Sequence, residues 1–74
     1  MSMSEIASKI LLLLKKSPRQ TPQSIASRLN ASVSTIRNAL VILSDLKLVE
    51  ARVRGLYEIT QLGERLLKDI STLK

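Results

Sequence analysis

The sequence predicts a single α+β domain, mostly helical, in which a β-hairpin lies between the third and the fourth of four helices. Two observations carry this prediction. Apolar residues recur at helical intervals in four stretches, 4–16, 21–30, 32–46 and 61–73. Over residues 49–60, apolar and polar side chains alternate instead, which is the period of a β-strand.

The length and composition limit how this domain can be stabilised. A chain of 74 residues, taken as one domain from 1 to 74, buries only a small core of its own. Such domains usually rely on disulfides, a metal ion or a second subunit. The sequence has no cysteine and no histidine, which excludes disulfides and a Cys/His zinc site. We therefore expect no metal and no cofactor, and a second subunit as the remaining source of stability.

The charge favours a polyanionic partner. Twelve Lys and Arg stand against six Asp and Glu, for a net charge of +6. This balance suits nucleic acid or an anionic membrane surface, although solubility alone can explain several net charges. The apolar run 10–14 is shorter than the ~7–15 residues of a signal peptide and the ~20 of a membrane span. We expect a soluble, cytoplasmic, nucleoid-associated protein that does not bind membranes.

The two middle helices have clear start and stop signals. Thr21 is a good N-cap and is followed by Pro22, which suits the first helical position. Asn30 suits the left-handed residue that ends a helix, and Ser32 is the next N-cap. Two helices separated by so short a turn form a helix-turn-helix, here over residues 21–46.

The two terminal helices, 4–16 and 61–73, carry more apolar residues than one packed face requires. Thr60 is expected to cap the last helix. A helix that is apolar all round is buried all round, so the surplus face is expected to contact a second subunit. The alternative is that these residues only cover the core. The predicted dimer interface consists of Leu11, Leu12, Leu67, Ile70 and Leu73.

The hairpin register can be predicted from the pattern of side chains. A two-residue loop would place polar residues opposite apolar ones. A three-residue loop, 54–56, places Val53 opposite Tyr57 and Ala51 opposite Ile59, so that all apolar residues share one face. We therefore expect the three-residue loop, with a positive φ at Gly55.

The stretch SIASRLNASVSTIRNALVILSDLKLVEARVRGLYEITQLGERLL resembles the winged-helix regulators of bacteria and archaea, in the broad MarR-like and ArsR-like sense. The resemblance implies a winged helix-turn-helix in which 49–60 is the wing and the terminal helices form a two-fold dimer. The sequence departs from the family at three points. Lys47 stands where glycine is usual, Val41 and Ile42 stand where charged residues are usual, and the wing is short.

In a helix-turn-helix, outward side chains near the start of the second helix read base edges in the major groove. Arg37 has the donors for guanine, Asn38 can pair with adenine, and a valine can contact a thymine methyl group. The residues predicted to contact bases are Val33, Ser34, Arg37 and Asn38. The alternative is that these polar side chains are merely solvated.

Phosphate contacts require cations, hydroxyls and helix N-termini around that helix. The residues predicted to contact the DNA backbone are Thr21, Gln23, Arg28, Ser32, Thr35, Arg52 and Arg54. A salt bridge to a glutamate of the wing is the competing interpretation for Arg52. The basic cluster of Lys15, Lys16 and Arg19 is equally consistent with DNA contact and with a solvated helix end.

Other functions have less support in the sequence. Tyr57, the one aromatic residue, is expected to pack in the core, and single-strand binders normally use several aromatics. The sequence has no nucleophile–base pair and no glycine-rich phosphate loop that would indicate an enzyme. We expect a homodimeric, sequence-specific regulator of transcription that binds double-stranded DNA. The alternatives are an architectural protein that coats DNA, and a protein-interaction module that uses Val33, Val41 and Ile42.

Overall fold

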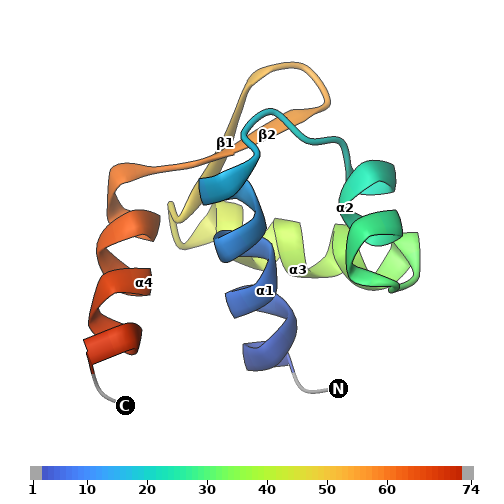
Figure 1. Cartoon of the computed structure of the whole chain (residues 1–74). Coiled ribbons are helices and arrows are strands. Elements are labelled where there is room, and N and C mark those ends of the chain that lie inside the picture. Colours follow the sequence, from blue (N-terminus) through green and yellow to red (C-terminus); the bar gives the residue numbers. More distant parts are fainter. Residues whose placement is uncertain (1–2, 73–74) are drawn as a thin grey trace.

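The computed structural model describes the backbone of residues 3–72 and the side chains of residues 5–69. Four helices and a two-stranded antiparallel hairpin follow one another in the predicted order, which confirms the fold class (Figure 1). The elements are α1 Met3–Lys16, α2 Pro22–Leu29, α3 Val33–Asp45, β1 Val49–Val53, β2 Leu56–Ile59 and α4 Gln61–Thr72. Within residues 3–72, no helix has the length and apolar character needed to cross a bilayer.

The core is built around α1. This helix contacts α2, α3, α4 and β2, and Figure 1 shows it between α4 and α2. Ile10 and Leu14 of α1 are fully buried, as are Ile25 of α2 and Ile36 of α3. Burying one such side chain contributes about 1.5–3 kcal/mol to folding. The stability of the domain therefore depends on α1 being covered on several sides at once.

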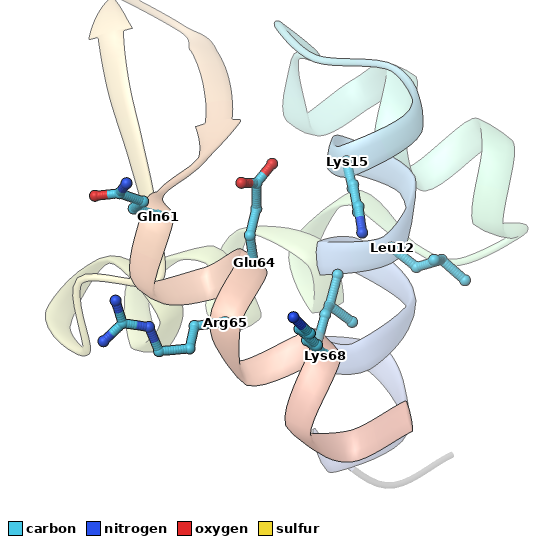
Figure 2. Close-up of a pocket in the computed structure, with 7 residues that line it drawn as sticks. Leu12, Lys15, Gln61, Glu64, Arg65 and Lys68 are labelled. Carbon is cyan, nitrogen blue, oxygen red and sulfur yellow. The ribbon is translucent and has the colours of Figure 1, made fainter. Parts of the chain in front are cut away.

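The prediction that Leu11 and Leu67 lie at a dimer interface is wrong. Leu11 is 2% exposed and Leu67 is 8% exposed, and both belong to the core of this chain. So small a chain needs a second face of α1 to complete its core, and α4 covers that face. Leu12 is 47% exposed, on the side of α1 drawn in Figure 2. The side chain of Ile70 and all of Leu73 lie outside the described residues.

The predicted caps of α2 are confirmed. The Thr21 side chain accepts a hydrogen bond from the Ser24 N–H at 3.1 Å, and the Ser24 hydroxyl accepts one from the Thr21 N–H at 3.0 Å. Asn30 ends the helix in the left-handed conformation, with φ 54°. The Ala31 N–H then donates to the Ala26 carbonyl at 2.9 Å, which completes a Schellman motif. Both ends of α2 are thus satisfied by local residues.

The predicted hairpin register is wrong, although Gly55 has the expected positive φ of 82°. Val53 pairs with Leu56, so the loop has two residues, and Val49 pairs with Ile59 at the base. Ala51 and Arg52 both stand against Tyr57, which forms a β-bulge. The prediction assumed one continuous register. The bulge instead shifts the register within the hairpin, so that a tight turn and an apolar pair at the base coexist. Ala51 and Val53 are exposed, because the outer wing extends beyond the core.

A third extended segment, which the sequence analysis missed, joins the hairpin. Gln20 and Tyr57 form an isolated antiparallel bridge. The Gln20 N–H donates to the Tyr57 carbonyl at 3.1 Å, and the Tyr57 N–H donates to the Gln20 carbonyl at 2.8 Å. A single pair of residues gives no alternating pattern that could have predicted it. The bridge ties the segment before α2 to the middle of the wing.

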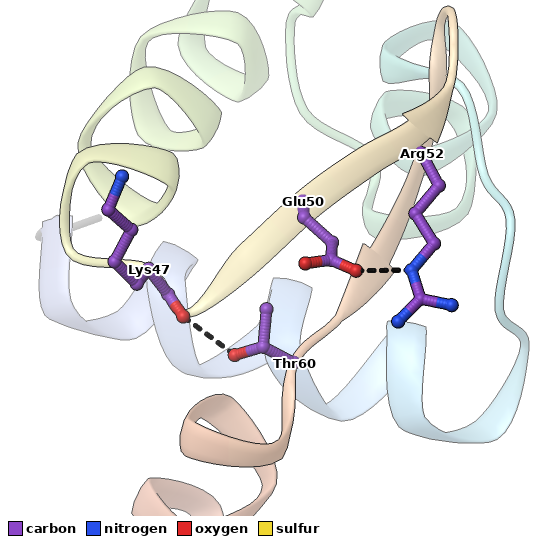
Figure 3. A network of polar contacts seen from close by, with 4 residues as sticks. All are labelled: Lys47, Glu50, Arg52 and Thr60. Atoms are coloured by element: carbon purple, nitrogen blue, oxygen red, sulfur yellow. Dashed lines mark hydrogen bonds and ion pairs between the residues drawn. The ribbon is translucent and has the colours of Figure 1, made fainter.

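The end of α3, the hairpin and the start of α4 meet at one junction, part of which is drawn in Figure 3. Lys47 adopts φ 64°, and the Leu48 N–H donates to the Leu43 carbonyl at 2.9 Å, so lysine takes the left-handed position that glycine usually holds. The Thr60 hydroxyl donates to the Lys47 carbonyl at 2.7 Å. The same hydroxyl accepts the Gly63 N–H at 3.0 Å, as expected of the residue that caps α4.

Gly63 is required by this close packing. A Cβ atom there would overlap the Leu48 carbonyl oxygen and lie 2.7 Å from Ile59 Cγ1. We expect Gly63→Ala to lower the free energy of unfolding by about 1–3 kcal/mol, because the backbone must move to admit the methyl group. Urea unfolding measures the change. Arg65→Ala, on the exposed side of the same helix, should stay within about 0.5 kcal/mol of the wild type.

At Lys47 we expect the opposite effect, a gain in stability on substitution. A residue with a Cβ pays about 1 kcal/mol in the left-handed region, and glycine does not. We expect Lys47→Gly to raise the free energy of unfolding by about 0.5–1 kcal/mol after the entropy of the unfolded glycine is counted. Thermal unfolding compares it with Lys47→Ala, which removes the same side chain and keeps the Cβ. Equal melting temperatures for the two variants would show that the left-handed conformation is not the cause.

Candidate nucleic-acid interface

α2 and α3 pack against each other and leave one side of α3 in solvent. Ile36, Leu40 and Leu43 face the core, whereas Ser34, Arg37 and Asn38 are exposed, as predicted. Val33 differs from the prediction. It is half-buried and packs against the core, because it lies one turn before the buried Ile36 on the same side of the helix. Three of the four residues predicted to read bases therefore have accessible side chains.

A hollow of about 450 Å³ lies between the start of α2, the outer side of α3 and the wing. It brings together Thr21, Gln23 and Arg37, which the sequence analysis had assigned to separate contacts. The other four lining residues were not among those predicted to contact DNA: Pro22, Val41, Gly55 and Tyr57. Val41 gave a signal, because an apolar residue on the solvent side of a helix, here 60% exposed, is unusual. Tyr57 contacts the core and also reaches the hollow.

The electrostatic character of this face comes partly from the backbone. The N-terminal end of a helix carries about half a positive charge, which attracts anions. Neither α2 nor α3 has an acidic residue in its first turn to oppose that charge. Arg37 adds a full positive charge one turn further along α3. The face can therefore bind anionic groups at two helix ends and at one guanidinium.

The hydroxyls at these helix ends already have partners within the chain. The Ser32 hydroxyl accepts from the Thr35 N–H at 3.2 Å and donates to Thr35 Oγ1 at 2.7 Å. The Thr21 hydroxyl belongs to the cap of α2. These three residues therefore position the starts of α2 and α3 in space. Gln23 is exposed beside Thr21, with its side chain accessible to a ligand in the hollow.

On the wing, Arg52 pairs with the chain itself (Figure 3). Its Nε donates to Glu50 Oε1 at 2.5 Å, which matches the competing interpretation from the sequence. This hydrogen bond, the charge of Glu50 and then that of Glu58 raise the pKa of Arg52. Glu50 and Glu58 stand opposite each other in the hairpin, where two like charges repel. Arg52 relieves this repulsion, which leaves Arg54, in the turn, as the cation of the wing tip.

The remaining predicted contacts lie elsewhere. Arg28 is exposed in the last turn of α2, at the opposite end of that helix from the hollow. Lys15 and Lys16 are in the last turn of α1, and Arg19, with φ 63°, is in the segment that leads to α2. None of these four cations lines the hollow. Among residues 3–72, no cluster of three possible ligands could hold a metal ion.

Comparisons with known proteins agree with this fold. The family model described as "Methanogenesis regulatory protein FilR1, N-terminal domain" matches residues 1–73. Among solved structures, the chain is similar to the crystal structure of T. acidophilum IdeR, with a TM-score of 0.68 and 31% identity. That match covers 85% of this chain but only 30% of the IdeR chain. No curated protein sequence matches.

Proposed function

Because the chain belongs to the family of FilR1 N-terminal domains, a family of winged-helix regulatory domains, we propose that it binds double-stranded DNA and regulates transcription. The observation that carries the proposal is the hollow that joins the start of α2, the side of α3 and the wing around Arg37. α3 would enter the major groove, and the wing would follow the neighbouring backbone. The proposal gives this chain a regulatory role. It does not assign to this chain the target genes of FilR1.

The exposed side chains of α3 support sequence-specific binding. Arg37 can donate two hydrogen bonds to guanine, and Asn38 can both donate to and accept from adenine. Ser34 lies one turn before Asn38 and can reach either a base or a phosphate. Val41 extends the exposed side by an apolar group that suits a thymine methyl. A surface used only for phosphates would need cations here in place of these residues.

Backbone contacts in this proposal come from around α3. At the start of α2, Pro22 has no N–H and the N–H groups of Thr21 and Ser24 bond within the cap, so the Gln23 N–H beside the hollow is the donor that suits a phosphate. Ser32 and Thr35 would contribute through the helix end that they cap. Arg54 at the wing tip and Arg28 would hold the flanking phosphates. Arg52 would contact DNA only by giving up its bond to Glu50. Such a protein acts at the nucleoid, in the cytoplasm.

We further propose that the active form is a homodimer. The side chains of Ile42, Leu46, Leu62 and Leu66 are 37–57% exposed along α3 and α4. A hollow of about 440 Å³ beside them is lined almost entirely by apolar residues. Asp45 and Lys47, on either side of Leu46 in the sequence, carry opposite charges that two copies could pair across a two-fold axis. The apolar surplus therefore favours the α3–α4 side over the predicted interface.

Selection of binding sites from random duplexes at near-physiological salt tests the DNA proposal. We expect an enriched inverted repeat whose half-sites are separated by about one helical turn, or ~34 Å. Arg37→Ala should lose about 1–3 kcal/mol of binding free energy on the selected site, and it should tolerate other bases at one position of that site. Arg65→Ala removes one cation of α4 that does not line the hollow, and serves as the control with an unchanged motif.

Two results would contradict specific binding. A steep salt dependence without an enriched motif would indicate an architectural protein. No duplex binding even at low salt would favour the protein-interaction module, for which the exposed Val41 and Ile42 provide a surface.

The dimer proposal has its own test. We expect sedimentation equilibrium to show a dimer that Leu46→Asp shifts to monomer, because a carboxylate would be buried in an apolar interface. Leu46 is 57% exposed and Val53, on the wing, is 56% exposed. Val53→Asp is therefore a matched control and should stay dimeric. Equal dissociation by both variants, or a monomeric wild type, would contradict the proposed interface.

A further inference from the structure

One leucine on α1 stands apart from its neighbours. Leu11 and Leu14 are buried, but Leu12 is 47% exposed. Lysines occupy the positions three before, three after and four after it, at Lys9, Lys15 and Lys16. These are the nearest neighbours of a residue on a helix surface. Leu12 is thus an exposed apolar group surrounded by cations, which we call the Leu12 face.

Two hollows meet at Leu12. The larger, about 680 Å³, lies between α1 and α4, and is lined by Leu12, Lys15, Gln61, Glu64, Arg65, Leu67 and Lys68. The smaller, about 210 Å³, lies towards α2 and is lined by Lys9, Leu12, Leu13, Lys16 and Leu29. Figure 2 shows Lys15 on α1 and Lys68 on the neighbouring α4. The surface therefore offers two depressions, one on each side of Leu12, and each is lined by both leucines and cations.

The charge of this face is positive. Its cations are Lys9, Lys15, Lys16, Arg65 and Lys68, against the carboxylates of Glu5 and Glu64. None of the residues that line the two hollows also lines the hollow around Arg37. A ligand on the Leu12 face would consequently leave the side chains proposed to read DNA accessible.

We propose that the Leu12 face docks an acidic amphipathic helix of a partner protein. Apolar side chains on one side of such a helix would enter the two hollows beside Leu12, and the flanking carboxylates would meet the lysines. Both features of the surface are then used. The inference does not depend on DNA binding by α3.

Charge and chemistry select this occupant over two others. A second copy of the chain would bring the same cations together across a two-fold axis, which is unfavourable for a protein of net charge +6. A DNA duplex would pair its phosphates with the lysines but would gain nothing from the apolar groups of Leu12 and Leu67. An acidic partner helix with apolar side chains complements both.

The test uses a fluorescent peptide of about 18 residues, long enough to hold a helix, with leucines along one side and glutamates elsewhere. A permuted peptide of the same composition, without the leucine stripe, is the reference. We expect the first peptide to bind the whole chain about tenfold more tightly than the second. Amide shifts in NMR spectra should be largest in α1 and in the facing side of α4.

Variants locate the site. Lys15→Glu and Leu12→Ser should each weaken binding of the peptide with the leucine stripe by about tenfold. Arg54→Glu makes the same change of charge on the wing and should leave peptide binding unchanged. Circular dichroism establishes that all three variants are folded, and Lys16→Glu replaces Lys15→Glu if that variant is unstable.

Several results would overturn the proposal. Equal affinity for the two peptides, or equal loss in Arg54→Glu, would show general charge attraction and no docking site. Amide shifts in α1 on addition of a random duplex, larger than those caused by the peptide, would assign the face to nucleic acid. Self-association that Leu12→Ser abolishes would assign it to a second copy of the chain.

Discussion

The hydrogen bonds around Leu48 hold four elements of this fold together. The Leu48 N–H donates to the Leu43 carbonyl of α3, and the Leu48 carbonyl accepts the Thr60 N–H at the end of β2. The Thr60 hydroxyl joins the Lys47 carbonyl to the Gly63 N–H of α4. The absence of a side chain at Gly63 lets α4 approach this closely. Because these bonds tie the turn after α3 to the junction between β2 and α4, the direction of the wing relative to α3 is set at the base of the hairpin.

The bridge between Gln20 and Tyr57 attaches the wing at a second point. It brings the segment before α2 to the hairpin, and with it the N-terminal end of α2. A hairpin held at its base and its middle keeps its direction, although Val53, farther out, is exposed and does not pack against the core. The hollow around Arg37 follows from these two attachments. Its walls come from three segments that are distant in the sequence.

The parts of the fold that were predicted from sequence depend on local interactions. Thr21, Asn30 and Ser32 cap helices through residues at most four or five positions away, so their roles are readable without the tertiary structure. The bulge of the hairpin and the burial of Leu11 depend on contacts between distant segments. Periodicity identified α1 as apolar on several sides, but it could not tell whether the second side meets α4 or another subunit.

The candidate site shows the same division. The outward positions of Arg37, Asn38 and Ser34 follow from the 3.6-residue period of a helix once its buried side is known. The engagement of Arg52 by Glu50 was foreseen as an alternative, because both residues lie near each other on one strand. The contribution of Gly55 and Tyr57 to the hollow was not predicted, since it depends on where the hairpin lies against α2 and α3. Winged-helix regulators usually have glycine at the position of Lys47, and this lysine adopts the left-handed backbone conformation that suits glycine.

The distribution of charge bears on which kind of DNA binding this domain can support. Arg37 is the one cation between Val33 and Asp45, and the basic residues of α1 and α4 lie away from the hollow. Each phosphate neutralised adds about 0.9 to the salt slope of binding, so one copy with few cations at its reading face gains little from counterion release. Coating DNA through phosphates alone would therefore be weak. In the proposed dimer, base contacts from two copies would provide the affinity that the charge of one reading face does not, and the remaining positive charge would serve the proposed docking surface around Leu12.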